Sequence, residues 1–73
     1  MGDIKKDTQK VEDLKNGEMS YINMFQEGGA SVYRCNDMYL LFSIPLYGGA
    51  ECYEGTYYEN QINDLVNEAY SWT

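Results

Sequence analysis

The chain has no histidine among its 73 residues, and this absence removes several kinds of chemistry at once. Cysteine–histidine nucleophiles, serine–histidine–aspartate triads and histidine metal sites are all excluded. The two cysteines, Cys35 and Cys52, are too few for a disulfide framework or a zinc knuckle. We expect both thiols to pack as small apolar groups. A single bridge between neighbouring strands is the alternative in an oxidising compartment.

Positive charge is also scarce, with five Lys and Arg residues against twelve Asp and Glu residues. The formal net charge is −7. Direct binding to a phosphate backbone or to an anionic lipid surface requires basic side chains, which most of this chain lacks. We therefore expect the partner to be a basic protein surface, and we expect no direct contact with nucleic acid or membrane.

Long apolar runs are missing too. The longest, Met38–Tyr47, is interrupted by Ser43 and Pro45 and falls far short of the ~20 residues that span a bilayer. The charged stretch 3–7 contains no apolar core of a signal peptide. We expect a cytoplasmic protein in which residues 1–73 form one small domain, because a chain of this length buries a single core.

What the sequence does contain predicts an α+β fold that begins with a helix over Asp3–Asn16. Ile4, Val11 and Leu14 recur there at near-helical spacing, Asp3 can cap the start, and Gly17 can end the helix. Aromatic and β-branched segments separated by turn residues follow. The predicted strands are Met19–Gln26, Ser31–Cys35, Met38–Ile44 and a short edge strand, Ala50–Glu54.

Short turns separate these strands, at Glu27–Gly29, Asn36–Asp37 and Gly48–Gly49, so we expect an antiparallel meander. Thr56 and Glu59 then match a capping box. The apolar stripe of the second helix comprises Tyr58, Ile62, Leu65, Val66 and Ala69, with Trp72 at the far end. We expect both helices to cover one face of the sheet and to leave the other face partly open.

Two carboxylate pairs are candidates for acid–base chemistry, Glu51 with Glu54 and Asp64 with Glu68. A solvated strand or helix face explains them equally well. No calcium-loop pattern is present, and the glycine pairs lack the lysine of a P-loop. We therefore expect a protein that is not an enzyme and that has no cofactor and no metal.

Tyrosine is over-represented, with eight copies. We assign Tyr21, Tyr39, Tyr58 and Tyr70 to the core or the sheet surface. Tyr47, Tyr53 and Tyr57 are interleaved with Glu51, Glu54 and Glu59 near the Gly48–Gly49 turn. Because tyrosine provides rigid apolar area and a hydroxyl, it is typical of protein interfaces. This corner is thus predicted to bind a partner.

The charge distribution supports the same region. Residues 1–17 carry four acids and four lysines, whereas residues 18–73 carry eight acids and one base, Arg34, and so the whole net charge of −7. We predict that the partner-binding residues are Glu51, Tyr53, Glu54, Tyr57, Glu59, Asp64 and Glu68, with the two tyrosines as anchors. Their carboxylates can occupy a groove that normally holds phosphates.

The chain resembles the small acidic phage-encoded anti-defence proteins of the anti-CRISPR, DNA-mimic type. The resemblance rests on these acids, on the tyrosines among them and on the short single domain. The resemblance implies an inhibitor, monomeric or homodimeric, that acts in the host bacterial cytoplasm on a nucleic-acid-binding complex such as a CRISPR effector. It would block the DNA-binding site or lock the conformation of its target. Two alternatives stay open: an oligomer that sequesters a nucleotide signal on tyrosines of its open sheet face, and an antitoxin or accessory subunit that neutralises a basic partner.

Overall fold

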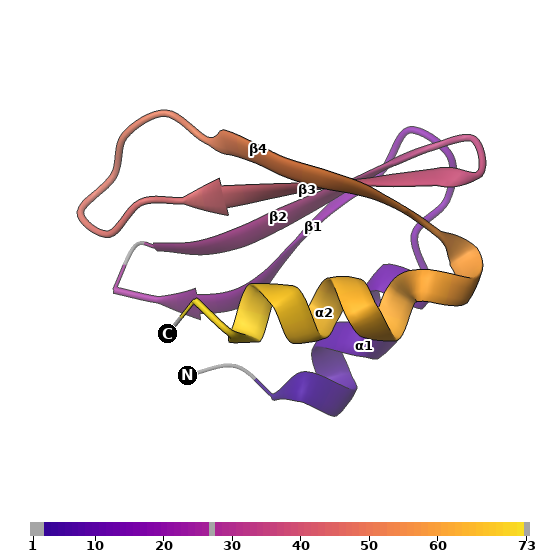
Figure 1. Ribbon diagram of the computed structural model, residues 1–73, viewed down its shortest axis with the longest axis horizontal. Coiled ribbons are helices and arrows are strands. Elements are labelled where there is room, and N and C mark those ends of the chain that lie inside the picture. The colour runs from indigo at the N-terminus through magenta and orange to yellow at the C-terminus, as the bar shows by residue number, and fades with distance from the viewer. Residues whose placement is uncertain (1–2, 27, 73) are drawn as a thin grey trace.

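The computed structural model describes residues 3–26 and 28–72 (Figure 1). Its elements are, in chain order, helix α1 (Ile4–Glu12), strands β1 (Met19–Phe25), β2 (Gly28–Cys35), β3 (Met38–Ile44) and β4 (Cys52–Tyr58), the 3-10 turn η1 (Glu59–Gln61) and helix α2 (Ile62–Tyr70). The predicted α+β class and the predicted order of helix, meander and helix are confirmed.

The four strands form one antiparallel sheet in the order β1-β2-β3-β4, so each strand pairs with its neighbour in sequence. The β2–β3 hairpin closes through Asn36 and Asp37, and Asn36 has the positive φ, 57°, that such a turn requires. Strand β3 has the predicted bounds and lies between two other strands, as its apolar residues on both faces indicate. The strand ends before Pro45, because proline has no backbone N–H to donate to the hydrogen-bond ladder of the sheet.

Both helices pack on the same face of the sheet, and the opposite face is left bare (Figure 1). The core between these layers consists of Val11, Leu14, Ile22, Ala30, Val32, Tyr39, Leu41, Ile62, Leu65, Val66 and Ala69. Full burial of a Val, Leu or Ile side chain stabilises the fold by about 1.5–3 kcal/mol. The four α2 residues in this set are the predicted stripe without Tyr58, and Trp72 packs against the core as expected.

Strand β4 is longer than predicted, and the second helix starts later. The expected strand was Ala50–Glu54, whereas the observed strand is Cys52–Tyr58. Within it, Thr56 lies opposite Leu40 of β3. The capping box at Thr56 is therefore wrong: pairing with β3 satisfies the backbone of this segment and outcompetes a local cap. The chain enters η1 at Tyr58, whose N–H donates to the side-chain oxygen of Gln61 at 3.1 Å, and α2 begins at Ile62.

The turn between β1 and β2 also differs from the prediction. Of its three expected residues, Glu27 lies outside the described residues, and Gly28 and Gly29 belong to β2. A Cβ on Gly29 would lie 2.8 Å from the Asn23 carbonyl oxygen and 2.9 Å from the Met24 Cα, and the φ of Gly29 is +145°. Glycine is needed here because β1 approaches β2 closely where their register shifts.

Helix α1 begins as predicted and ends early. The Asp3 carboxylate caps its start by accepting two backbone N–H groups of the first turn. The helix ends at Glu12 and not at Asn16. The N–H of Gly17 instead donates to the carbonyl of Arg34 at 2.9 Å, so the residues after α1 are drawn into pairing with β2.

A buried carboxylate joins α1 to β1 and α2. Asp7 is 3% exposed and accepts hydrogen bonds from the Asn23 backbone N–H, at 2.9 Å, and from the Tyr70 hydroxyl. The Lys10 amine lies 3.6 Å from a carboxylate oxygen of Asp7. The side-chain amide of Asn23 in turn donates to the Ala69 carbonyl at 3.3 Å. Burial, followed by the hydrogen bond to Asp7 and its negative charge, raises the pKa of Tyr70.

Candidate functional site

The sheet divides the seven predicted partner-binding residues between its two sides. Glu51 lies on the bare side, where its carboxylate accepts from the Ser31 hydroxyl at 3.2 Å and the Tyr33 hydroxyl at 3.3 Å. Tyr53 lies on the same side, with its ring against Phe42. The helix-covered side carries Glu54, Tyr57, Asp64 and Glu68, and Glu59 lies in η1 at the junction of β4 and α2.

A β-bulge in β4 explains this division. Leu41 lies opposite Gly55 and Phe42 lies opposite Tyr53, so Glu54 is an extra residue in the ladder. In a regular strand, Tyr53 and Tyr57 would share one face, because their separation is an even number of residues. The bulge places them on opposite faces, and the two predicted anchors are not brought together.

Tyr57 lies between β4 and α2, within reach of the charges of three carboxylates on these elements. The tyrosine is partly buried against the core, and this burial raises the pKa of its hydroxyl. The negative charges of Glu68, Asp64 and Glu54 raise that pKa further, in that order. We call Glu54, Tyr57, Asp64 and Glu68 the acidic surface.

Arg34 and Lys10 make their contacts away from the acidic surface. Arg34, the only base after residue 17, donates to the Leu14 carbonyl at 2.6 Å and to the Asn36 carbonyl at 3.0 Å. Its guanidinium also lies 5.6 Å from the ring centroid of Tyr39. Within residues 3–26 and 28–72, the one ion pair joins Lys10 to Asp7. The acidic surface thus has no ion pair with the described part of the chain.

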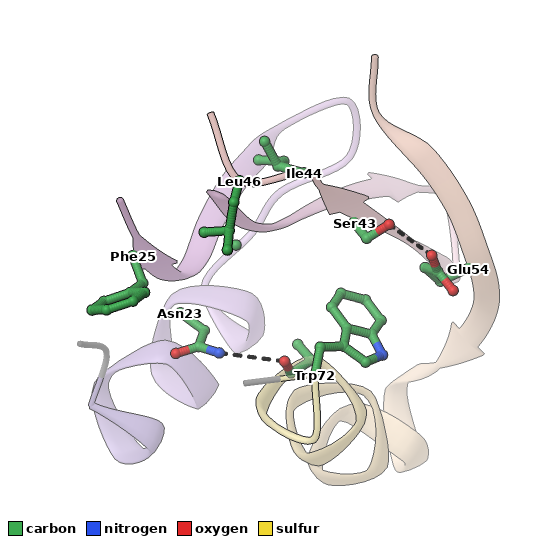
Figure 2. Close-up of a pocket in the computed structure, with 9 residues that line it drawn as sticks. Asn23, Phe25, Ser43, Ile44, Leu46, Glu54 and Trp72 are labelled. Carbon is green, nitrogen blue, oxygen red and sulfur yellow. Dashed lines mark hydrogen bonds between the residues drawn. The ribbon is translucent and has the colours of Figure 1, made fainter. Parts of the chain in front are cut away.

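A pocket of about 530 Å³ adjoins the acidic surface near the C-terminal end of α2 (Figure 2). Phe25, Ile44, Leu46 and Trp72 provide apolar walls, and Ser43 and Glu54 provide polar groups at one side. The Ser43 hydroxyl donates to the Glu54 carboxylate at 2.6 Å, and the Trp72 indole N–H donates to Glu68 at 3.0 Å. Apolar walls beside a carboxylate suit a long basic side chain, which has an alkyl stem and a charged end.

The side of the sheet away from the helices is rich in aromatic residues. We call it the open face and define it by Tyr21, Tyr33, Leu40, Phe42, Tyr53 and Tyr58. The ring centroids of Tyr33 and Phe42 are 5.4 Å apart, and those of Phe42 and Tyr53 are 5.7 Å apart, both in edge-to-face geometry. Burial, then the charge of Glu51 and its hydrogen bond, raise the pKa of Tyr33. Tyr21 lies on the sheet surface, one of the two places predicted for it, whereas Tyr58 lies at the end of β4 and not in the apolar stripe of the second helix, where it was expected.

The residues considered for catalysis are arranged as follows. Glu51 and Glu54 lie on opposite sides of the sheet and so do not form a pair. Asp64 and Glu68 are exposed on α2. Among the residues that the structure describes, no group of three or more metal-ligating side chains of His, Cys, Asp or Glu comes together.

None of the described helices has the length and apolarity required to cross a membrane.

The two thiols differ from the sequence-based expectation. Cys35 and Cys52 are both exposed and free, so neither packs as a small core residue and they do not form a bridge. Their cross-strand partners in β3 are Met38 and Ser43, which lie near opposite ends of that strand.

Sequence reasoning missed two features of the site. The pocket was not foreseen, because its walls come from β1, the end of β3 and the end of α2, which are far apart in sequence. Asp7 was counted only as a surface charge. Its spacing from Val11 and Leu14, four and seven residues on, places it on the apolar side of α1 and is the signal that could have identified it.

No protein-family model, no curated protein and no solved structure matches this chain.

Proposed function

We propose that the protein is a non-catalytic binding protein whose acidic surface occupies a basic surface of a nucleic-acid-binding protein or complex. The observation that carries this proposal is that the charges of Glu54, Asp64 and Glu68 all lie within reach of Tyr57, with no ion pair to the described chain. Arg and Lys side chains that hold phosphates accept carboxylates in the same geometry. A partner's basic groove would therefore neutralise charges that the fold leaves unpaired.

The dimensions of the molecule support this mode of binding. The accessible surface is 4657 Å², and a standard interface takes about 800 Å² from each partner. The exposed side of α2 and the adjoining part of β4 would contribute to this area. The pocket beside Glu54 adds a recess into which one basic side chain of the partner can insert its alkyl stem.

The resemblance to small acidic anti-defence proteins leads us to propose a CRISPR effector as the target and the host bacterial cytoplasm as the place of action. In this proposal the inhibitor competes with DNA for the effector's basic groove. An antitoxin or an accessory subunit would use the same surface on a different basic partner, so the identity of the captured partner separates these cases.

The test uses three immobilised baits in a bacterial lysate: the wild type, a triple variant (Glu54→Gln, Asp64→Asn, Glu68→Gln), and a control triple variant (Glu12→Gln, Asp13→Asn, Glu18→Gln). Both variants lose three negative charges, but the control changes lie in or near α1. Proteins captured by the wild type and identified by mass spectrometry are purified, and their binding to labelled DNA is measured in competition with each bait protein.

We expect the wild type and the control to displace DNA, and the acidic-surface variant to bind at least tenfold more weakly. Affinity should also fall as salt rises, because screening weakens contacts between exposed charges. The proposal fails if the acidic-surface variant competes as well as the wild type, or if the captured partner binds DNA and inhibitor simultaneously.

A further inference from the structure

The open face is an aromatic and aliphatic surface that neither helix covers. Tyr21, Tyr53 and Tyr58 are 47%, 58% and 49% exposed, although they come from paired strands of a sheet whose other face is covered by helices. Leu40 and Phe42 lie between them on β3 and are half-buried, and the Phe42 ring packs against the rings of Tyr33 and Tyr53. Monomeric proteins seldom expose so many contiguous aromatic groups without a partner.

The open face is nearly uncharged, in contrast to the rest of the molecule. Its defining residues are all aromatic or aliphatic, and the Glu51 carboxylate, which reaches it, accepts hydrogen bonds from the hydroxyls of Ser31 and Tyr33. The acidic surface lies on the other side of the sheet. Two copies of a protein with net charge −7 can therefore approach most closely through this face, with their carboxylates directed away from each other.

We infer that the open face binds a second copy of this chain, in a two-fold symmetric dimer that stacks sheet on sheet. Tyrosine suits such a self-complementary contact, since its hydroxyl both donates and accepts and its ring packs edge-to-face. Four strands of seven or eight residues cover about 19 × 23 Å in plan. A dimer would then bury on the order of 1,000 Å² in total, which is at the lower limit for a specific interface and fits a dissociation constant in the micromolar range.

Other occupants fit the open face less well. A basic protein would find the Glu51 carboxylate there, which already accepts two hydrogen bonds from the protein's own hydroxyls. A nucleotide could stack on the tyrosines, but its phosphates would find no basic side chain, because the Arg34 guanidinium is held by the Leu14 and Asn36 carbonyls. The inference is independent of the proposed function, which uses the opposite side of the sheet.

The experiment measures molecular mass by analytical ultracentrifugation from about 2 to 500 µM, in low and in high salt, a range chosen to bracket micromolar affinity. The test variants are Tyr53→Glu and Tyr21→Glu, which place a charge on the open face at exposed positions. The matched control is Tyr47→Glu, in a loop tyrosine that is 82% exposed and lies outside the open face. Circular dichroism verifies that all the variants are folded.

We expect the wild type and Tyr47→Glu to shift from monomer to dimer with concentration, and each open-face variant to dimerise at least tenfold more weakly. Salt should strengthen the dimer by screening its net charge, whereas salt weakens the partner binding proposed above. A monomer at every concentration in both salts would overturn the inference. Equal weakening by Tyr47→Glu and Tyr53→Glu would also overturn it.

Discussion

Strand β3 carries adjacent leucines that face opposite sides of the sheet and meet different environments. Leu41 faces the helices and is fully buried, whereas Leu40 faces away from them and is only half-buried. The same division holds for the carboxylates that accept a tyrosine hydroxyl, Asp7 on the covered side and Glu51 on the open face. Two short helices can cover only one side of this sheet. The apolar residues on the other side therefore lie outside the core.

The largest expected effect comes from comparing the two leucines. Leu41→Ala should lower the free energy of unfolding by about 2–5 kcal/mol, since it leaves a cavity in the core. Leu40→Ala should cost about 1 kcal/mol in the dissociated monomer, because little surrounding structure closes over it. Urea unfolding at low micromolar concentration measures both. Equal losses would show that the open face is as enclosed in the monomer as the helix-covered face.

A smaller difference is expected between the two hydrogen-bonded carboxylates. Asp7→Asn should destabilise the protein by about 1–3 kcal/mol, because a buried acceptor of the Asn23 N–H and the Tyr70 hydroxyl loses its charge. Glu51→Gln should stay within about 0.5 kcal/mol, as expected at a solvent-exposed position. Both are measured by chemical denaturation at pH 7. A loss for Glu51→Gln as large as that for Asp7→Asn would contradict the contrast between the two sides.

The smallest effect concerns the tyrosine partners of these carboxylates. The pKa values of Tyr70 and Tyr33 are both raised in the folded protein, first of all by burial. A folded-state pKa above the unfolded value of about 10 means that this stabilisation is complete below pH 10. It is lost as the pH rises toward the folded-state pKa. Stability should thus decline above about pH 10.

Phenylalanine variants separate the contributions of Tyr70 and Tyr33 to this loss of stability at alkaline pH. Tyr70→Phe should cost about 1 kcal/mol at neutral pH, through the lost hydrogen bond to Asp7, and should flatten the alkaline decline. Tyr33→Phe should flatten it less, because the pKa of Tyr70 is displaced much further. Thermal unfolding between pH 7 and pH 11 measures both. An alkaline decline that is unchanged in Tyr70→Phe would refute the assignment to this residue.

Local patterns were sufficient where an element's residues decide its own structure. The alternation of apolar residues gave the bounds of β3, and the Asn36–Asp37 pair gave its hairpin. The apolar stripe at positions 62, 65, 66 and 69 identified the buried side of α2. Patterns failed where distant segments compete for the same residues. Thr56 has the chemistry of a helix cap, yet its pairing with Leu40 keeps it in β4.

The candidate site shows the same limit. The sequence located the net charge in residues 18–73 and its tyrosines beside its acids, but it placed Tyr53 and Tyr57 together as anchors. One extra residue, Glu54, places them on opposite faces. Such a bulge depends on how β4 pairs with β3, and neither strand's composition reports that pairing.

The sequence by itself determined the order of the elements, the central position of β3, the apolar side of α2 and the part of the chain that carries the acidity. These properties follow from periodicity and composition, which act over a few neighbouring residues. Tertiary structure alone decided which acids share a surface, that Asp7 is buried, and that one aromatic face stays uncovered. Each of these depends on strand register and on which segments pack together, and a shift of one residue exchanges the two faces of a strand.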